Sequence, residues 1–436
     1  MSDFALAILH WQTVEDPDPV LRESTGWLEI RVGGTALTRN EDVWSRTVRD
    51  SVLVSGWPLA MWLAHYWWRL NYEPLPYNNQ LPAPDWRMAH ELGAADHGYV
   101  WPRILFASDG EVVQVWAESL PMPGQSVQYL AGLDGPQSVP LTAFQSAIEG
   151  FVDSVLDRLA AVGQENSDLA GLWSKVARER ADLETARRRQ LEAQLGFDPG
   201  QCPGDLLAAL LDLIATTGHA AMVELAPAYG PQRDMPTKIT ALRWAQGIEI
   251  APQVEPFQAY DSPLPWQQGV AAARNVRDRM GDRHGPVRDE VLDDLLGIAQ
   301  RTRLDEVTDR LRPVSVMRPD GKGRFIFLPR KRHPTSHRFE LARILGDWVT
   351  VPQGGDEWRV SSDVVTARQK RQRAFAAEFL CPIDALVQFL DGDYSDDAIE
   401  AASQHFAVSE WTIRSLLANN GYIPRCEPAL PYRLQG

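Results

Sequence analysis

His90 and His97 are the first candidates for metal ligands, because they flank a stretch that also holds Glu91 and Asp96. Two histidines on one helix face bind one zinc ion when they are four residues apart, whereas these are seven apart with Gly93 between them. Seven helical residues span about 10.5 Å, too far for one ion about 2 Å from each ring nitrogen. We therefore interpret this stretch as a helix end before a strand.

Basic residues gather in the C-terminal third of a chain whose net charge is -15. Residues 318–343 contain eight basic and two acidic side chains, and residues 368–373 add four basic ones. If the two stretches fold together, their positive charge attracts phosphate, nucleic acid or an acidic protein segment. The alternative is two separate solvated surfaces, with Arg373 paired to Glu378 or Asp384.

Three segments of this region occur in a characteristic order: RFELARILGDWV at 338–349, RQRAFAAEFLCP at 371–382 and DAIEAASQHFAVSEWTIRSLLANNGYI at 397–423. In order and spacing they resemble the ImmA/IrrE family of gluzincin-like metallopeptidases, over roughly 262–423. FAAEFLCP is the most specific block. The resemblance implies a mainly helical domain with a small sheet. It also implies a cytosolic bacterial protein that cleaves or binds transcriptional repressors in mobile-element, phage-defence or stress regulation.

The resemblance places the zinc-site positions of the family on residues that cannot form that site. The first histidine falls on Arg343, the catalytic glutamate on Ile344 and the second histidine on Asp347. The third ligand falls within 369–373, which has no carboxylate. Arginine is not deprotonated to bind a metal, isoleucine is no base, and one aspartate binds zinc weakly. We expect no metal, cofactor or peptidase activity, with Ile344 packed and Arg343 paired to Asp347.

Two upstream histidines are the remaining candidates for an unconventional metal site. His333 and His337 are four residues apart, but Pro334 disfavours the helical conformation at His333. We interpret both as solvated surface residues beside a basic run. An active metallopeptidase with non-standard ligands that cleaves a regulator is the alternative function.

If the family fold brings the two basic stretches together, the former active site becomes a basic cleft. The residues expected to line this candidate cleft are Arg330, Lys331, Arg332, Arg338, Arg368, Lys370, Arg371 and Arg373. We expect the cleft to bind a protein partner or an acidic segment, with nucleic acid as the alternative partner.

The last helices, over 398–420, have the spacing of a helix-turn-helix, with Ser409 as the N-cap of the second helix. Glu410 and Trp411 lie where a recognition helix would begin, and only Arg414 is basic, so contacts to DNA phosphates would be missing. We interpret these helices as domain structure and keep a DNA-binding regulator as a second alternative function.

The elements that position these residues divide into three expected parts. Residues 1–140 form a Trp-rich α+β domain, because they hold ten of the 16 tryptophans, alternating strand-like runs and a hairpin signal at 103–119. Residues 141–261 show helical periodicity and then Pro-rich segments, which indicates a helical connector and linker. Residues 262–436 form the degenerate ImmA/IrrE-like domain. The predicted fold class is multidomain α+β.

Composition excludes several classes of protein. With 44% hydrophobic and 23% charged residues in 436, the chain is typical of a globular protein and not of a disordered or polytopic membrane protein. Residues 51–68 lack formal charge, but a helix from Pro58 to about Leu70 is roughly 20 Å long, short of the roughly 30 Å bilayer core. Three separate cysteines and no export signal indicate a cytoplasmic protein without a membrane partner.

The leading hypothesis is therefore a catalytically inactive ImmA/IrrE-like regulatory or sensor protein. It recognises a protein or nucleic-acid partner, and this function rests on analogy with the family.

Overall fold

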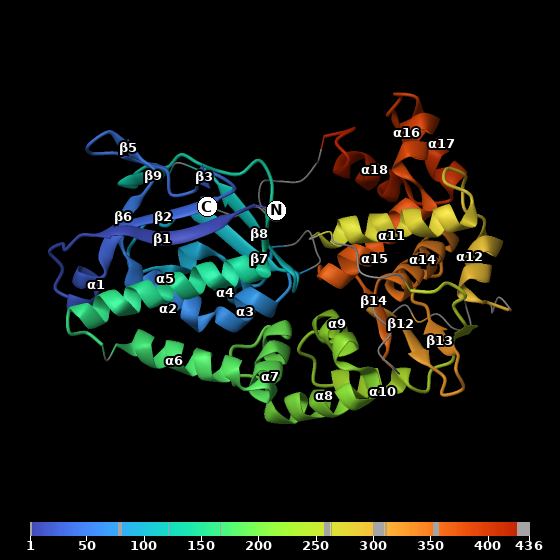
Figure 1. Cartoon of the computed structure of the whole chain (residues 1–436), viewed down its shortest axis with the longest axis horizontal. Helices are drawn as coiled ribbons and strands as arrows, with labels where there is room; N and C mark the ends of the chain where they lie inside the picture. The colour runs from blue at the N-terminus through green and yellow to red at the C-terminus, as the bar shows by residue number, and fades with distance from the viewer. Residues whose placement is uncertain are drawn as a thin grey trace. The chain divides into compact units, whose positions relative to one another are not determined.

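The computed structural model describes residues 2–76, 81–120, 122–165, 167–256, 262, 264–299, 309, 312–351 and 357–424. The chain divides into two compact units, unit 1 up to Cys202 and unit 2 from Pro203 (Figure 1). Each unit combines helices with small antiparallel sheets, which confirms the predicted multidomain α+β fold. Within the described residues, no helix is both long and apolar enough to cross a membrane.

In its described residues, unit 1 contains three antiparallel sheets. In the first, β2 (Thr25–Val32) pairs with β1 (Phe4–Trp11), β3 (Thr35–Ala36) and β6 (Val52–Ser55). The second has the order β10 (Gln137–Pro140), β8 (Val112–Glu118), β7 (Arg103–Ser108), and the third β5 (Thr47–Arg49), β4 (Asn40–Asp42), β9 (Val127–Tyr129). The helices are α1 (Pro19–Glu23), α2 (Gly56–His65), α3 (Trp67–Tyr72), α4 (Pro84–His90), the 3-10 turn η1 (Leu92–Ala95), α5 (Leu141–Ala161), α6 (Asp168–Ala181) and α7 (Leu183–Gln194).

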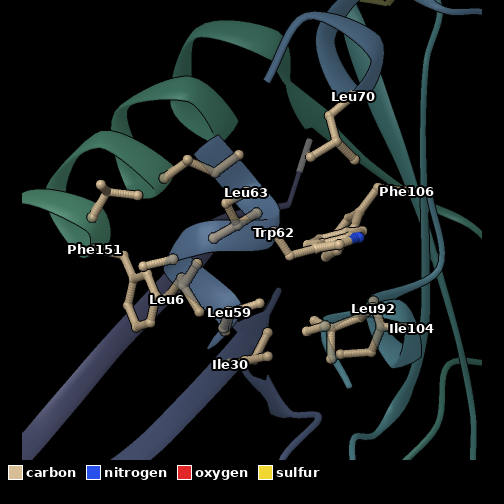
Figure 2. Packing of buried hydrophobic residues seen from close by; sticks show 14 of the residues in the cluster. Leu6, Ile30, Leu59, Trp62, Leu63, Leu70, Leu92, Ile104, Phe106 and Phe151 are labelled. Atoms are coloured by element: carbon tan, nitrogen blue, oxygen red, sulfur yellow. The ribbon is translucent and has the colours of Figure 1, made fainter. Parts of the chain in front are cut away.

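The core of unit 1 forms where α2 and α5 pack against the first sheet. Figure 2 shows Leu59 and Trp62 of α2 among Ile30 of β2, Phe106 of β7 and Phe151 of α5, all of them buried. Six of the ten tryptophans in residues 1–140 are buried, namely Trp62, Trp67, Trp68, Trp86, Trp101 and Trp116. The predicted hairpin at 103–119 is confirmed, since β7 and β8 pair in register around a tight turn.

The helix predicted from Pro58 to about Leu70 is wrong in both its start and its continuity. The buried Ser55 accepts a hydrogen bond from the Trp57 amide and caps α2, so the helix begins at Gly56. The backbone leaves helical geometry at Tyr66, and α3 starts anew at Trp67. The Ser55 cap places Pro58 third in the helix, still within the first turn, where its missing N–H breaks no intrahelical hydrogen bond.

The expected three-part division also differs from the structure. Residues 141–261, predicted as a connector, are shared between the two units. The apolar face of α5, including Phe144, Phe151 and Val155, is buried in the core of unit 1. The helices after residue 203 belong to unit 2 instead. Helical periodicity predicted these helices but not the core that each one joins.

The described part of unit 2 is mainly helical around one four-stranded antiparallel sheet. The strand order is β11 (Ile248–Ile250), β13 (Phe325–Leu328), β12 (Val314–Pro319), β14 (Arg359–Ser362). The helices are α8 (Gly204–Thr217), α9 (His219–Tyr229), α10 (Met235–Leu242), α11 (Pro265–Met280), α12 (Asp289–Leu296), α14 (Pro334–Thr350), α15 (Ala367–Leu380), α16 (Ile383–Leu390), α17 (Asp396–Phe406) and α18 (Glu410–Asn419).

Two glycines allow the central helices of unit 2 to approach one another. A Cβ atom at Gly346 of α14 would lie 2.6 Å from the Phe375 ring of α15. One at Gly269 of α11 would lie 2.3 Å from the Arg371 carbonyl oxygen, also on α15. A side chain at either point would therefore collide with α15, which packs against both α11 and α14 (Figure 1).

The C-terminal helices match the predicted helix-turn-helix spacing. α17 ends with Ala407 in the left-handed region, and the Ser409 hydroxyl accepts a hydrogen bond from the Thr412 amide as the N-cap of α18. Ile399, Phe406 and Ile413 are buried, so the two helices share the core of unit 2.

Candidate functional site

α14 and α15 bring together the positions that the family resemblance assigns to the zinc site. Arg343 and Asp347 lie one turn apart on α14, and both hydrogen-bond to side chains of α15. We define the polar network of unit 2 as Glu224, Arg343, Asp347, Arg359, Arg368, Gln369 and Gln372. Every member is buried, and Asp347, Gln369 and Gln372 are fully inaccessible to solvent.

Asp347 is the centre of this polar network. Its Oδ1 accepts hydrogen bonds from Arg368 Nε at 2.7 Å and Gln372 Nε2 at 2.9 Å. Its Oδ2 accepts from Arg368 Nη2 at 2.6 Å and Arg359 Nη1 at 3.1 Å. The fork-like contact from Arg368 is the geometry in which arginine binds carboxylates most strongly. Four donors therefore occupy both oxygens of the carboxylate.

The pKa values of Asp347 and Arg368 are set by burial and by the charges of their partners. Burial alone would raise the pKa of Asp347, but Arg368 and Arg359 hold it well below its ordinary value. Burial would lower the pKa of Arg368, and the Asp347 carboxylate raises it above the ordinary value instead. Both groups are charged at neutral pH, as a buried ion pair with full hydrogen bonding requires.

The ion pair expected between Arg343 and Asp347 is wrong. Arg343 Nη2 donates to the Ser362 carbonyl oxygen at 2.6 Å and to Gln369 Oε1 at 2.5 Å, so the guanidinium points to the end of β14. Asp347 instead forms ion pairs with Arg359 of β14 and Arg368 of α15. Helical spacing makes the two residues neighbours, but stronger partners lie on the adjacent elements. Ile344, between them, is fully buried in the apolar core, as expected.

Gln369 links this site to α9, which lies outside the segment that resembles the family. Its Nε2 donates to Glu224 at 2.8 Å, and Thr366 donates to both oxygens of the same carboxylate at 2.9 Å. Burial raises the pKa of Glu224, with the Arg368 charge acting in the opposite direction. A further hydrogen bond joins Arg368 Nη1 to the Ala220 carbonyl oxygen of α9 at 3.2 Å. α9 therefore completes the polar network.

The predicted basic cleft is not an open surface. Arg330 is buried, and its two terminal nitrogens bind Asp363 at 2.6 and 2.7 Å. Arg338 is buried against Asp289, and Arg368 against Asp347. Counting basic residues cannot separate cations in core ion pairs from cations in solvent.

The remaining predicted cleft residues differ in exposure. Lys331 and Arg332 are exposed, whereas Lys370, Arg371 and Arg373 are half-buried along α15. Arg371 donates to Gln268 at 3.2 Å. Arg373 donates to the Ser362 and Val364 carbonyl oxygens, at 3.4 and 2.9 Å.

His333 and His337, the two upstream candidates, differ in exposure and in contacts. His333 is exposed, hydrogen-bonds to Thr335 at 2.8 Å and precedes α14, because Pro334 is the first helical residue. His337 lies 4.0 Å from the carboxylate of Glu340. Across the described ranges, no group of three or more His, Cys, Asp or Glu residues is arranged to hold a metal ion.

His90 belongs to a separate buried cluster in unit 1. It ends α4, as expected, stacks on Trp86 and hydrogen-bonds at 3.0 Å to both the Phe106 carbonyl oxygen and Glu73. Glu73 also accepts two hydrogen bonds from Arg69. His97, seven residues on, contacts the Ala95 carbonyl oxygen and does not approach this cluster through any described contact. The cluster therefore ties α3, α4 and β7 together.

Sequence reasoning missed Glu224, Arg359 and Thr366. The signal for Glu224 was present, since it is the only charged residue between His219 and Tyr229 in an otherwise apolar helix, and a buried carboxylate there requires a partner. Arg359 carried no local signal, because its partner is set by the pairing of β14 with β12.

No family model, curated protein or solved structure matches this chain.

Proposed function

We propose that the protein is a catalytically inactive, ImmA/IrrE-like regulatory protein that binds a partner instead of hydrolysing it. The main support is the state of Asp347, which stands where the resemblance implies the second zinc-binding histidine. Both of its oxygens accept hydrogen bonds from arginine and glutamine donors. A metal ion at this carboxylate would have to displace Arg359 and Arg368 from a fully buried position.

The other two positions support the same proposal. A zinc peptidase needs a carboxylate near the metal to take a proton from the attacking water. Ile344 stands at that position and is fully buried among apolar side chains. Arg343, at the position of the first histidine, brings a positive charge that would repel a metal ion.

Charge favours a protein as the partner over DNA. α17 and the start of α18 present Asp396, Asp397, Glu400 and Glu410, while their one arginine, Arg414, pairs with Asp396 at 2.6 Å. A DNA-reading helix pair needs cations for the phosphates, and these helices would repel them. Together with the net charge of -15, this supports a protein partner in a cytoplasmic regulatory system, as the resemblance implies.

Metal analysis of the purified full chain tests the inactive site. We expect far less than one zinc per chain and an unchanged melting temperature in chelator. One tightly held zinc per chain, lost in His333→Ala or His337→Ala, would instead establish the alternative of a metallopeptidase with non-standard ligands.

A restored variant tests the alignment. The combined change Arg343→His, Ile344→Glu, Asp347→His and Gln369→Glu should create a zinc site if the four positions match those of the family. A folded variant, by circular dichroism, without zinc would contradict the alignment. If the combined variant does not fold, the double variant Ile344→Glu with Asp347→His provides the second test. It is incubated with cobalt, and bound cobalt is detected by its visible absorption bands.

Affinity capture from the source cell tests partner binding. Lys331→Ser with Arg332→Ser removes the two exposed cations of the predicted cleft and should lower recovery of the specific partner, without a change in melting temperature. Lys238→Ser, a half-exposed lysine paired with Asp234 on α10, is the matched control. Equal recovery with all three proteins would place the binding surface elsewhere.

A further inference from the structure

Both ring nitrogens of the fully buried His90 in unit 1 face hydrogen-bond acceptors. Nδ1 lies 3.0 Å from the Phe106 carbonyl oxygen, and Nε2 lies 3.0 Å from Oε2 of Glu73. A carbonyl oxygen and a carboxylate can only accept, so both ring nitrogens must donate. A neutral imidazole has a single N–H and satisfies only one of the two contacts. The geometry therefore requires one proton more than a neutral histidine beside a carboxylate provides.

The contacts of Glu73 assign this proton to His90. Arg69 donates from Nε to Oε2 of Glu73 at 2.7 Å and from Nη2 to Oε1 at 3.2 Å. Hydrogen bonds from a cation to both oxygens favour the ionised form of a carboxylate. Glu73 is therefore the acceptor, and His90 is an imidazolium with an N–H on each ring nitrogen. Turning the ring over would place carbon atoms against both acceptors, so neither hydrogen bond would remain.

The charges near the ring compensate an imidazolium. Besides Glu73, the Arg69 guanidinium contacts Asp85 of α4 at 2.9 Å and Asp198 at 3.4 Å. One guanidinium is thus surrounded by three carboxylates, and a positive charge on His90 brings the group closer to neutrality. Since Arg69 and His90 are buried, this compensation reduces the cost of holding two cations away from water.

Other titratable groups on the elements around His90 have different partners. On α4, Arg87 binds the Glu91 carboxylate at 2.7 and 3.1 Å. His65 of α2 is exposed and lies 4.0 Å from Asp198. Arg103 of β7 donates to the Met122 sulfur, and η1 contains only Leu, Gly and Ala. No described contact joins any of these groups to the His90 ring.

The short helix α4 depends on these contacts for its position. It has seven residues, too few for a stable isolated helix, and its N-cap residue Ala83 has no side chain that can cap it. Its buried side chains are Trp86, Ala89 and His90. The Trp86 and His90 rings stack with centroids 4.1 Å apart, and the negative face of an indole attracts a cation. Protonation of His90 therefore strengthens two of the contacts that hold α4.

We propose that His90 and Glu73 form a pH-sensitive switch, which holds α4 against α3 and β7 while both nitrogens of His90 are protonated. Loss of the Nε2 proton leaves a nitrogen lone pair facing a carboxylate oxygen inside the core, and this contact is then repulsive. The folded state therefore holds a proton that the unfolded chain releases more readily, so the stability of unit 1 falls as pH rises. The switch is independent of the proposed regulatory function and of any partner or metal.

Nuclear magnetic resonance of the full chain with nitrogen-15-labelled histidine tests the protonation state directly. The signals of His90 are assigned by their loss in His90→Gln. We expect both ring nitrogens to carry a proton at about pH 6 and one to lose it as the pH is raised to about 9, with faster hydrogen exchange in α4. A His90 nitrogen without a proton at about pH 6, or hydrogen exchange in α4 that does not follow the titration, would overturn the proposal.

Glu73→Gln provides the second test, because a glutamine amide can donate to a neutral His90 while its oxygen accepts from Arg69. In the wild type, the unfolding equilibrium constant of unit 1 from urea titrations should rise by up to about tenfold per pH unit where His90 loses its proton. Glu73→Gln needs no additional proton and should lose most of this dependence.

His97→Gln is the matched control. His97 is exposed, contacts the Ala95 carbonyl oxygen and lies outside the cluster, so this variant should keep the pH dependence of the wild type. Equal pH dependence in the wild type and Glu73→Gln, or an equal reduction in Glu73→Gln and His97→Gln, would contradict the switch. If Glu73→Gln does not fold, the protonation state of His90 in the wild type decides.

Discussion

Replacing Asp347 by alanine should destabilise unit 2 more than any other single change in the polar network. The substitution removes the acceptor of four hydrogen bonds and leaves Arg359 and Arg368 buried without their counterion. Breaking a buried ion pair by deleting one partner costs about 3–5 kcal/mol. At about 2–4 °C per kcal/mol for a unit of this size, the melting temperature should fall by roughly 6–20 °C.

Two companion variants make this prediction specific. Arg343→Met removes a buried cation that has neutral partners, so it should cost only about 1–2 kcal/mol, mainly for lost hydrogen bonds. Asp234→Ala breaks a solvated pair with Lys238 on α10 and should cost less than about 0.5 kcal/mol. Scanning calorimetry of the full chain, with hydrogen exchange to follow α14 and α15, measures all three.

The pH dependence gives a further check on the same variant. Because the folded-state pKa of Asp347 is lowered, its contribution to stability is complete above its unfolded pKa, about 3.9, and is lost as pH falls through the folded value. The deficit of Asp347→Ala should therefore be constant from pH 7 to 5 and shrink in stronger acid. A loss below 1 kcal/mol, or a loss equal to that of Arg343→Met, would refute the ion-pair reasoning.

Three more stability predictions follow from the described contacts. Gly269→Ala should be strongly destabilising, because its Cβ would meet the α15 backbone. Gly150→Ala, on α5 with no atom within 4 Å of its Cβ, should stabilise the protein by about 0.5–1 kcal/mol. Melting temperatures that change in the same direction in both variants would contradict this reasoning. Arg69→Leu leaves Glu73 buried without its cation, so urea unfolding should show a loss of about 3–5 kcal/mol in unit 1. Ser55→Ala removes the cap of α2 and should cost about 1 kcal/mol in the same assay, with no change contradicting the role of the cap.

The sequence predicted elements well where the signal is local. Alternating residues and a turn predicted the β7–β8 hairpin, and the serine before Glu410 predicted the start of α18. The closeness of Arg343 and Asp347 to α15 agrees with the expectation from the family resemblance. The hairpin and the cap depend on short-range spacing, which a single sequence contains, whereas the contact between α14 and α15 was expected only from the resemblance.

The partners of buried charges could not be predicted in this way. Asp347 is four residues from Arg343, yet it pairs with Arg359 and Arg368, which reach it only after β14 joins β12 and α15 packs on α14. The same limit explains why Arg330 was predicted as a cleft residue although it is buried against Asp363. Tertiary packing decides which cations face water. Counts of charged residues along the chain carry no information about that packing.

The contribution of α9 has a consequence for how this chain can be divided. A fragment beginning at Ser262 would contain the whole segment that resembles the family, but it would lack Glu224 and the Ala220 carbonyl oxygen. Thr366, Gln369 and Arg368 would then each lose an acceptor inside the core. The fragment would also lack β11, so that β13 would become an exposed sheet edge. The segment that must be kept together for folding therefore begins further toward the N-terminus than the segment that the motifs identify.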